Sequence, residues 1–152
     1  MLGSHPSNLI GGMNKTLKEN NLFFLKKRLK DLLNRPEIFI GNFEGPLTLF
    51  KDKNISLPFA CHHRFLDIIN QGKINLFSLA NNHTMQYGYN NFKFTSEKMI
   101  LNKFFPLGLK NNGKGTIPLK LEIQDNHIIF ISFSLRPEDT PYNPSYANEK
   151  DL

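Results

Sequence analysis

Hydrophobic residues recur at helical spacing early in the chain, beginning just after residue 20. Residues three and four apart lie on one face of a helix, so this spacing predicts an amphipathic helix. The helix should end before Pro36, because proline disfavours helical geometry in the residue that precedes it. Thr16 and Glu19 have the spacing of a capping box at its start. The apolar positions are Leu22, Leu25, Leu29, Leu32 and Leu33.

Three short apolar runs predict strands, at residues 37–41, 74–80 and 104–107. Amphipathic segments at residues 64–71 and 88–102 separate these runs and predict helices. Strands that alternate with helices indicate an α/β domain whose helices cover the faces of the sheet. The helix at residues 88–102 is expected to face inward through Phe92, Ser96, Met99 and Ile100.

The pattern changes after residue 107. Residues 108–116 are rich in glycine and asparagine, which predicts a loop. This loop is not expected to bind phosphate, because its glycines lack the ending of a phosphate-binding motif. Residues 119–123 alternate apolar with polar positions, whereas residues 127–134 are mostly apolar, so we expect a hairpin of one half-exposed and one buried strand. The complete order of elements predicts a layered α/β sandwich with a mixed sheet.

The length of 152 residues predicts a single domain, with a loop at residues 1–12 and an irregular tail at residues 135–152. Its 14 phenylalanines supply apolar volume for a core. No apolar run has membrane-spanning length, and no secretory signal is visible, so the sequence does not indicate a location.

The formal net charge is +6, which indicates either attraction to a polyanion or a lysine-rich surface with no special partner. The one dense basic group, at residues 26–30, lies on the first predicted helix, where a solvated face explains it. No nucleic-acid motif accompanies the charge, so nucleic acid is not an expected partner. Cys61 is the single cysteine, which excludes an intrachain disulfide. A buried thiol is favoured over a nucleophile beside His62 and His63.

Polar side chains follow the first two predicted strands at the point where each strand ends. Asn42 and Glu44 follow the first strand, and Asn82 and His83 follow the second. The carboxyl ends of parallel strands meet at one edge of a sheet, where α/β proteins bind ligands, so we expect these side chains to converge. A carboxylate, amide oxygens and an imidazole suit Mn, Fe, Zn or Mg better than a thiolate-binding metal.

Each of these residues also has a plainer interpretation. Asn82 would cap the next helix with His83 on the surface, and Asn42 and Glu44 would lie in a solvated loop. Asn81 would hydrogen-bond the backbone and shape its turn. Tyr87 and Gly88 would shape the start of the next helix. The remaining histidines, His5, His62, His63 and His127, are expected on the surface.

Two segments resemble the hallmark motifs of a known family: residues 40–48, IGNFEGPLT, and residues 79–88, LANNHTMQYG. The family is that of the capsule-synthesis CapA proteins, also called poly-γ-glutamate biosynthesis proteins, within the calcineurin-like metallophosphatase superfamily. The resemblance continues through Thr95, Pro118 and the hairpin, and so extends over nearly the whole chain.

The resemblance implies that Asn82, with Asn42 or Glu44, binds a divalent metal and that His83 is the general acid of a phosphoester-type hydrolysis. The family usually has a Gly-Asp segment before residues 1–3 and later His-Trp-Gly and Gly-His-x-His segments, which are absent here, and Gln86 replaces a common Asp. We therefore expect metal binding by this chain to be weak or absent, and the chain alone to be inactive and marginally stable.

The leading hypothesis is thus a CapA-type, metallophosphatase-like protein, or a truncated copy of one, that acts in making or exporting an anionic capsular polymer. Its partners would be this polymer or the machinery that makes it, and family members often work at the cell envelope. A second hypothesis is a non-catalytic module whose basic surface binds an acidic polymer or a partner protein. A third is a gene remnant without a present function.

Overall fold

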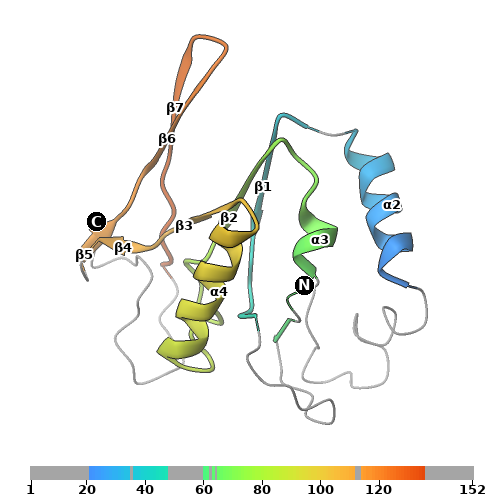
Figure 1. The fold of residues 1–152 in the computed structure, drawn as a ribbon. Coiled ribbons are helices and arrows are strands. Elements are labelled where there is room, and N and C mark those ends of the chain that lie inside the picture. Colours follow the sequence, from blue (N-terminus) through green and yellow to red (C-terminus); the bar gives the residue numbers. More distant parts are fainter. Residues whose placement is uncertain are drawn as a thin grey trace.

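The computed structural model describes residues 21–34, 36–47, 60–61, 63, 65–111 and 114–135. The predicted loop at residues 1–12, the capping box and, apart from Leu135, the predicted tail lie outside the described residues. Within the described ranges the chain forms both helices and strands, as the predicted α/β class requires (Figure 1).

A three-stranded parallel sheet, in the order β1-β2-β3, is the centre of the fold. Its strands are β1 (Ile38–Asn42), β2 (Ile74–Ser78) and β3 (Phe104–Leu107), which confirms the three predicted strands to within two residues at each end. The ends of all three strands lie in line, because Asn42 pairs with Ser78 and Ser78 pairs with Leu107. The turns that follow β1 and β2 therefore leave the sheet at the same edge.

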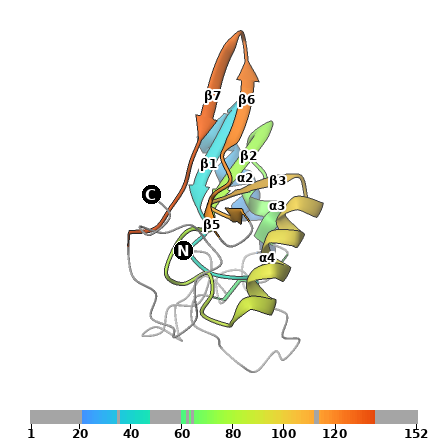
Figure 2. The same ribbon diagram turned by 90° about the vertical axis from the view of Figure 1, so that its left-hand side faces the viewer.

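Two helices cover one face of this sheet, α3 (Phe65–Ile69) and α4 (Tyr89–Leu101) (Figure 2). The third helix, α2 (Asn21–Leu33), packs beside α3. Each overlaps a helix that the sequence predicted. Helix α2 ends at Leu33, and the next residue, Asn34, has a left-handed φ of 46° and an N–H that donates to the Lys30 carbonyl at 3.1 Å.

Phe77 of β2 is at the centre of the core between the sheet and the helices. Its ring makes edge-on contacts with Phe39 and Phe43, with ring centroids 5.7 and 6.2 Å away, and a tilted contact with Phe104 at 5.8 Å. Such pairs stabilise by about 0.5–1.5 kcal/mol each beyond the area they bury. The helices and their flanking turns add the buried side chains of Phe65, Leu66, Ile68, Met85, Phe92 and Met99.

The buried face of α4 differs from the one that the sequence predicted. Phe92 and Met99 are buried as expected, but Ile100 is 58% exposed, so its predicted burial was wrong. Two polar residues, Asn91 and Thr95, occupy the buried face instead. Burial of a polar side chain is unfavourable unless it is hydrogen-bonded, so a reading of local hydrophobicity places such residues outside.

The opposite face of the sheet carries no helix in the described part of the chain. Ile40, Leu76 and Phe105 share this face, because Ile40 pairs with Leu76 and Leu76 pairs with Phe105. Leu76 is fully buried, but Ile40 is 56% and Phe105 41% exposed. Of the two sheet faces that the sequence predicted to carry helices, the described residues therefore cover one.

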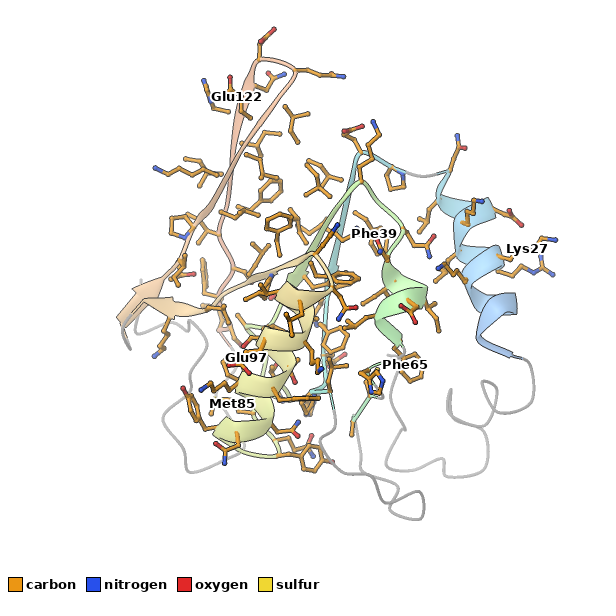
Figure 3. All side chains as sticks on the ribbon, viewed as in Figure 1. Lys27, Phe39, Phe65, Met85, Glu97 and Glu122 are labelled. Carbon is orange, nitrogen blue, oxygen red and sulfur yellow. The ribbon has the colours of Figure 1, made fainter. Side chains whose placement is uncertain are left out.

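The antiparallel strands form separate sheets and do not extend the parallel one. Strands β6 (Leu119–Ile123) and β7 (Asn126–Phe130) form the predicted hairpin, which projects beyond the sheet with Glu122 near its tip (Figures 1 and 3). Strand β6 alternates between half-buried and exposed positions as predicted. Strand β7 is not buried, since Ile129 is 57% exposed, so that prediction was wrong. Its apolar composition alone did not reveal that one side faces solvent.

The basic side chains of α2 face solvent, as expected for a solvated helix face. Lys26, Lys27, Arg28 and Lys30 are all exposed, and Lys27 points away from the rest of the molecule (Figure 3). Among the described residues, no helix is both long enough and apolar enough to cross a membrane.

Residues 108–116 were predicted as a loop, and the described part of this segment contains the short pair β4 (Lys110–Asn111) and β5 (Lys114–Thr116). Gly108, just before β4, has a φ of 81°, and a Cβ there would lie 2.6 Å from Ala80 Cβ and 3.0 Å from the Ser132 carbonyl oxygen. The hydroxyls of Ser132 and Ser78 are 2.6 Å apart. Gly108 thus lets the chain beyond the hairpin approach the carboxyl edge of the sheet.

We expect Gly108→Ala to lower the free energy of unfolding by about 2–4 kcal/mol, because left-handed strain and overpacking each cost roughly 1–3 kcal/mol. Gly115→Ala is the matched control. Gly115 has a φ of 61°, but no atom beyond its two chain neighbours lies within 4 Å of an added Cβ, so only left-handed strain should lower the free energy of unfolding there. Urea unfolding measures both variants, and equal losses would contradict the close approach at Gly108.

Candidate functional site

The turn after β1 and the turn after β2 are in direct contact through Asn81. Its Nδ2 donates to the Phe43 carbonyl oxygen at 2.9 Å and to Asn42 Oδ1 at 3.2 Å. Its Oδ1 accepts the backbone N–H of His83 at 3.1 Å. Asn81 is only 8% exposed. One buried amide therefore joins the two turns, and the backbone hydrogen bonding considered for Asn81 from the sequence is observed.

His83 and Glu44 face each other across these two turns. His83 Nε2 lies 4.0 Å from Glu44 Oε1, and the two side chains are 15% and 38% exposed. Asn82 is 6% exposed, with its Nδ2 3.3 Å from His83 Nε2. Asn42 ends β1 and is linked to the second turn through Asn81. The structure thus brings His83 close to Glu44 and Asn82, while Asn42 is linked to the second turn through Asn81.

Residues 82–87, which include His83, form consecutive turns that lie between β2 and α4. The Gln86 N–H donates to the His83 carbonyl at 3.1 Å, and the Gly88 N–H donates to the Met85 carbonyl at 2.8 Å. Gly88 is the N-cap of α4 with a φ of 81°, as expected of a residue that shapes the start of this helix. Met85 is 2% exposed and anchors the turns in the core. Burial raises the pKa of the Tyr87 hydroxyl in the same segment.

His63 and His127 are exposed as expected, while His5 and His62 lie outside the described residues. Cys61 contacts the turn after β1 through its backbone, because its N–H donates to the Pro46 carbonyl at 3.0 Å. Cys61 is 3% exposed, and burial raises the pKa of its thiol well above the ordinary value. The predicted buried thiol is therefore confirmed, because a nucleophile needs an accessible thiolate.

The donor atoms at this edge fit part of a divalent-metal site. The described residues hold no group of three or more His, Cys, Asp or Glu side chains placed to bind a metal. The edge instead offers the Glu44 carboxylate, the His83 imidazole and the amides of Asn42 and Asn82. Oxygen donors with an imidazole suit Mn, Fe, Zn or Mg. Because Glu44 is the single anionic donor among the four, their electrostatic attraction for a cation is modest.

Two residues of α4 that support the Glu44 turn were not predicted to do so from the sequence, in which Thr95 was named only as part of the family resemblance and Asn91 was not singled out. Asn91 and Thr95 of α4 hydrogen-bond the two backbone groups of Leu47. The available signal was their spacing of four residues, which places them on one helix face beside Phe92 and Met99. Their partner, however, is more than 40 positions earlier in the chain, beyond the reach of a local pattern.

Comparison with protein-family models matches residues 9–151 to the bacterial capsule synthesis protein family PGA_cap. The chain belongs to this family. The match includes all the described strands and both turns of the candidate site, and it confirms the family resemblance of the two motifs. Membership in PGA_cap indicates a part in bacterial capsule synthesis. No curated protein and no solved structure matches the chain.

We expect Asn81→Asp to lower the free energy of unfolding by about 2–4 kcal/mol, because the new oxygen would be a second acceptor facing the oxygens of Phe43 and Asn42. Asn102→Asp is the matched control, since the Asn102 side chain is exposed and donates to Lys98 of its own helix. That substitution should cost only about 0.5–1 kcal/mol. Urea unfolding at neutral pH measures both, and a small loss at Asn81 would show that the turns do not depend on its amide.

We expect Cys61 in the folded PGA_cap chain to react with a thiol reagent at least about tenfold more slowly than in the urea-unfolded chain, because reaction needs an exposed thiolate. Folding raises the thiol pKa, so the folded chain keeps its proton as the pH rises past the ordinary value of 9.0. The thiolate fraction rises with pH in both states, so the absolute difference between the two rates should grow between pH 7 and 9 while the folded chain stays the slower one. Labelling by Ellman's reagent follows it, and equal rates in both states would contradict the burial of Cys61.

Proposed function

We propose that this PGA_cap protein carries a metallophosphatase-like site at the edge where β1 and β2 end, and that it acts in the synthesis or export of an anionic capsular polymer of the poly-γ-glutamate type. The observation that supports this most is the approach of His83 to Glu44 at 4.0 Å across two turns joined by one buried amide. A proton carrier beside an oxygen-rich cation site is the arrangement that metal-assisted hydrolysis needs.

In this proposal Asn42, Glu44 and Asn82 hold a divalent metal, Mn, Fe, Zn or Mg. Asn42 Oδ1 accepts one hydrogen bond from Asn81, which leaves a lone pair for a cation. Glu44 is more than one-third exposed, so its carboxylate is accessible to an ion from solvent. When bound, the metal would polarise a phosphoryl or carbonyl oxygen of the substrate.

His83 is proposed to hold the proton that the leaving group receives. Nε2 without a proton accepts from Asn82 Nδ2, 3.3 Å away, whereas protonated Nε2 is attracted to the Glu44 carboxylate. Imidazole carries protons near neutral pH, which suits it to general acid catalysis.

One anionic donor holds a divalent cation weakly, so we expect the 152-residue chain to have at most low hydrolytic activity on its own. Robust hydrolysis of a phosphate ester by this chain that His83→Ala abolishes would contradict this part of the proposal. It would show that the four side chains suffice for catalysis.

We expect Mn²⁺ to bind this chain, and Glu44→Gln and Asn82→Ala each to weaken that binding by about tenfold or more, as loss of a site group commonly does. Glu97→Gln is the matched control. Glu97 is exposed on α4 and pairs with Lys93, so the same loss of charge occurs away from the edge. Isothermal titration with Mn²⁺ measures all three.

The site would be refuted by equal Mn²⁺ affinity in Glu44→Gln and Glu97→Gln, or by a wild-type chain that binds no divalent ion tested. In the second case, salt-sensitive binding of poly-γ-glutamate would instead support the non-catalytic, polyanion-binding alternative.

A further inference from the structure

Glu44 lies in a short turn, residues 43–47, outside the regular strands. The near end of this turn is fixed at Phe43, whose N–H donates to the Ser78 carbonyl at 3.0 Å and whose carbonyl accepts from Asn81. The far end is Leu47, which is fully buried and makes one isolated bridge with Cys61. Buried backbone groups outside a sheet need other hydrogen-bond partners, so the chain must provide them at Leu47.

A closed ring of hydrogen bonds supplies these partners from α4. The Leu47 N–H donates to Thr95 Oγ1 at 2.9 Å, and the Thr95 hydroxyl donates in turn to the Asn91 carbonyl at 2.8 Å. Asn91 Nδ2 then donates to the Leu47 carbonyl at 2.5 Å. Thr95 is fully buried and Asn91 is 3% exposed. Because the hydroxyl proton is used within the helix, the oxygen lone pair is directed at the Leu47 N–H.

Helix α4 therefore supports both turns of the candidate site. It begins directly after the turns at residues 82–87, so the chain itself connects it to His83. It reaches the other turn through Asn91 and Thr95, in the first two helical turns after Tyr89. One helix is thus joined to the His83 turn by continuity of the chain and to the far end of the Glu44 turn by hydrogen bonds.

We infer that Asn91 and Thr95 are positioning residues, which determine where the Glu44 carboxylate lies relative to His83 and Asn82. This inference rests on the proposed function, because it concerns the same site. Three residues span at most about 10 Å of extended backbone, so a displacement of Leu47 passes directly to Glu44. Pro46 between them is buried and has a fixed φ, and its carbonyl accepts the Cys61 N–H at 3.0 Å, so the link from Leu47 to Glu44 is stiff at this residue.

The competing explanation is that the ring only satisfies buried groups and stabilises the fold. The two explanations differ in what they predict at the site. If the ring only stabilises the fold, breaking it lowers the unfolding temperature and leaves metal affinity unchanged. If the ring also positions Glu44, breaking it weakens metal binding as well. This second effect should disappear when Glu44 has lost its carboxylate.

The test uses the full 152-residue chain with Thr95→Val, which removes the hydroxyl at nearly constant shape, and Thr95→Ser, which restores it. Asn91→Ala breaks the ring independently. Asn75→Ala is the control for stability, because Asn75 is 3% exposed and accepts from the Gln71 and Gly72 N–H groups beside the start of β2, away from the site. Mn²⁺ titration gives affinity, and thermal unfolding gives stability.

We expect Thr95→Val and Asn91→Ala to weaken Mn²⁺ binding by about tenfold, within the range seen for groups that orient metal ligands. Thr95→Ser should restore affinity to within about twofold of wild type, and Asn75→Ala should lower only the unfolding temperature. Thr95→Val combined with Glu44→Gln should bind no more weakly than Glu44→Gln alone. Wild-type affinity in Thr95→Val, or additive losses in the double variant, would overturn the inference.

A wild-type chain that binds no Mn²⁺ would refute the proposed function, and positioning would then be judged by NMR. The side-chain amide signals of Asn81 report the hydrogen bond to Phe43 O at the near end of the Glu44 turn. Thr95→Val should shift these signals, and Thr95→Ser should restore them, while Asn75→Ala leaves them unchanged. Unshifted Asn81 signals in Thr95→Val would overturn the inference in that case.

Discussion

The side-chain amide of Asn81 is the contact on which the arrangement of the candidate site depends. Parallel pairing brings the ends of β1 and β2 to about one strand spacing, 4.8 Å, but the turns beyond those ends are outside the ladder. Asn81 donates to the first turn and accepts from the second, so it fixes both with one planar group. A carboxylate would lack the donors, and an apolar side chain would leave the Phe43 carbonyl without this bond.

Much of the framework could be predicted from the sequence because its signals are local. The apolar runs that became β1, β2 and β3, and the helical spacing that became α2 and α4, each lie within about 15 residues of chain. The convergence of Glu44 and His83 followed from one general rule, that parallel strands open at a common edge. Neither inference needed to know which residues pair across the sheet.

The parts that could not be predicted depend on distant partners. Ile100 is as apolar as the buried Met99, and Ile129 is as apolar as the half-buried Ile128, so only the packing of the whole chain leaves these two side chains exposed. Thr84 and Thr95 are both fully buried, yet only the Thr95 hydroxyl has hydrogen-bond partners within the described residues. Sequence cannot separate these two threonines, because the group that distinguishes them is the backbone of Leu47, 48 positions from Thr95.

The apolar side chains left uncovered on the sheet and the hairpin have a consequence for how the protein behaves in solution. Ile40, Phe105, Ile129 and Ile131 all expose more than two-fifths of their surface, on a molecule of net charge +6. Like charge keeps such molecules apart, and dissolved ions at 0.1 M screen that repulsion at separations beyond about 10 Å. Sulfate also strengthens the association of apolar surfaces. Both effects act in the same direction, so the chain is most readily dispersed in dilute electrolyte and is salted out as ionic strength rises.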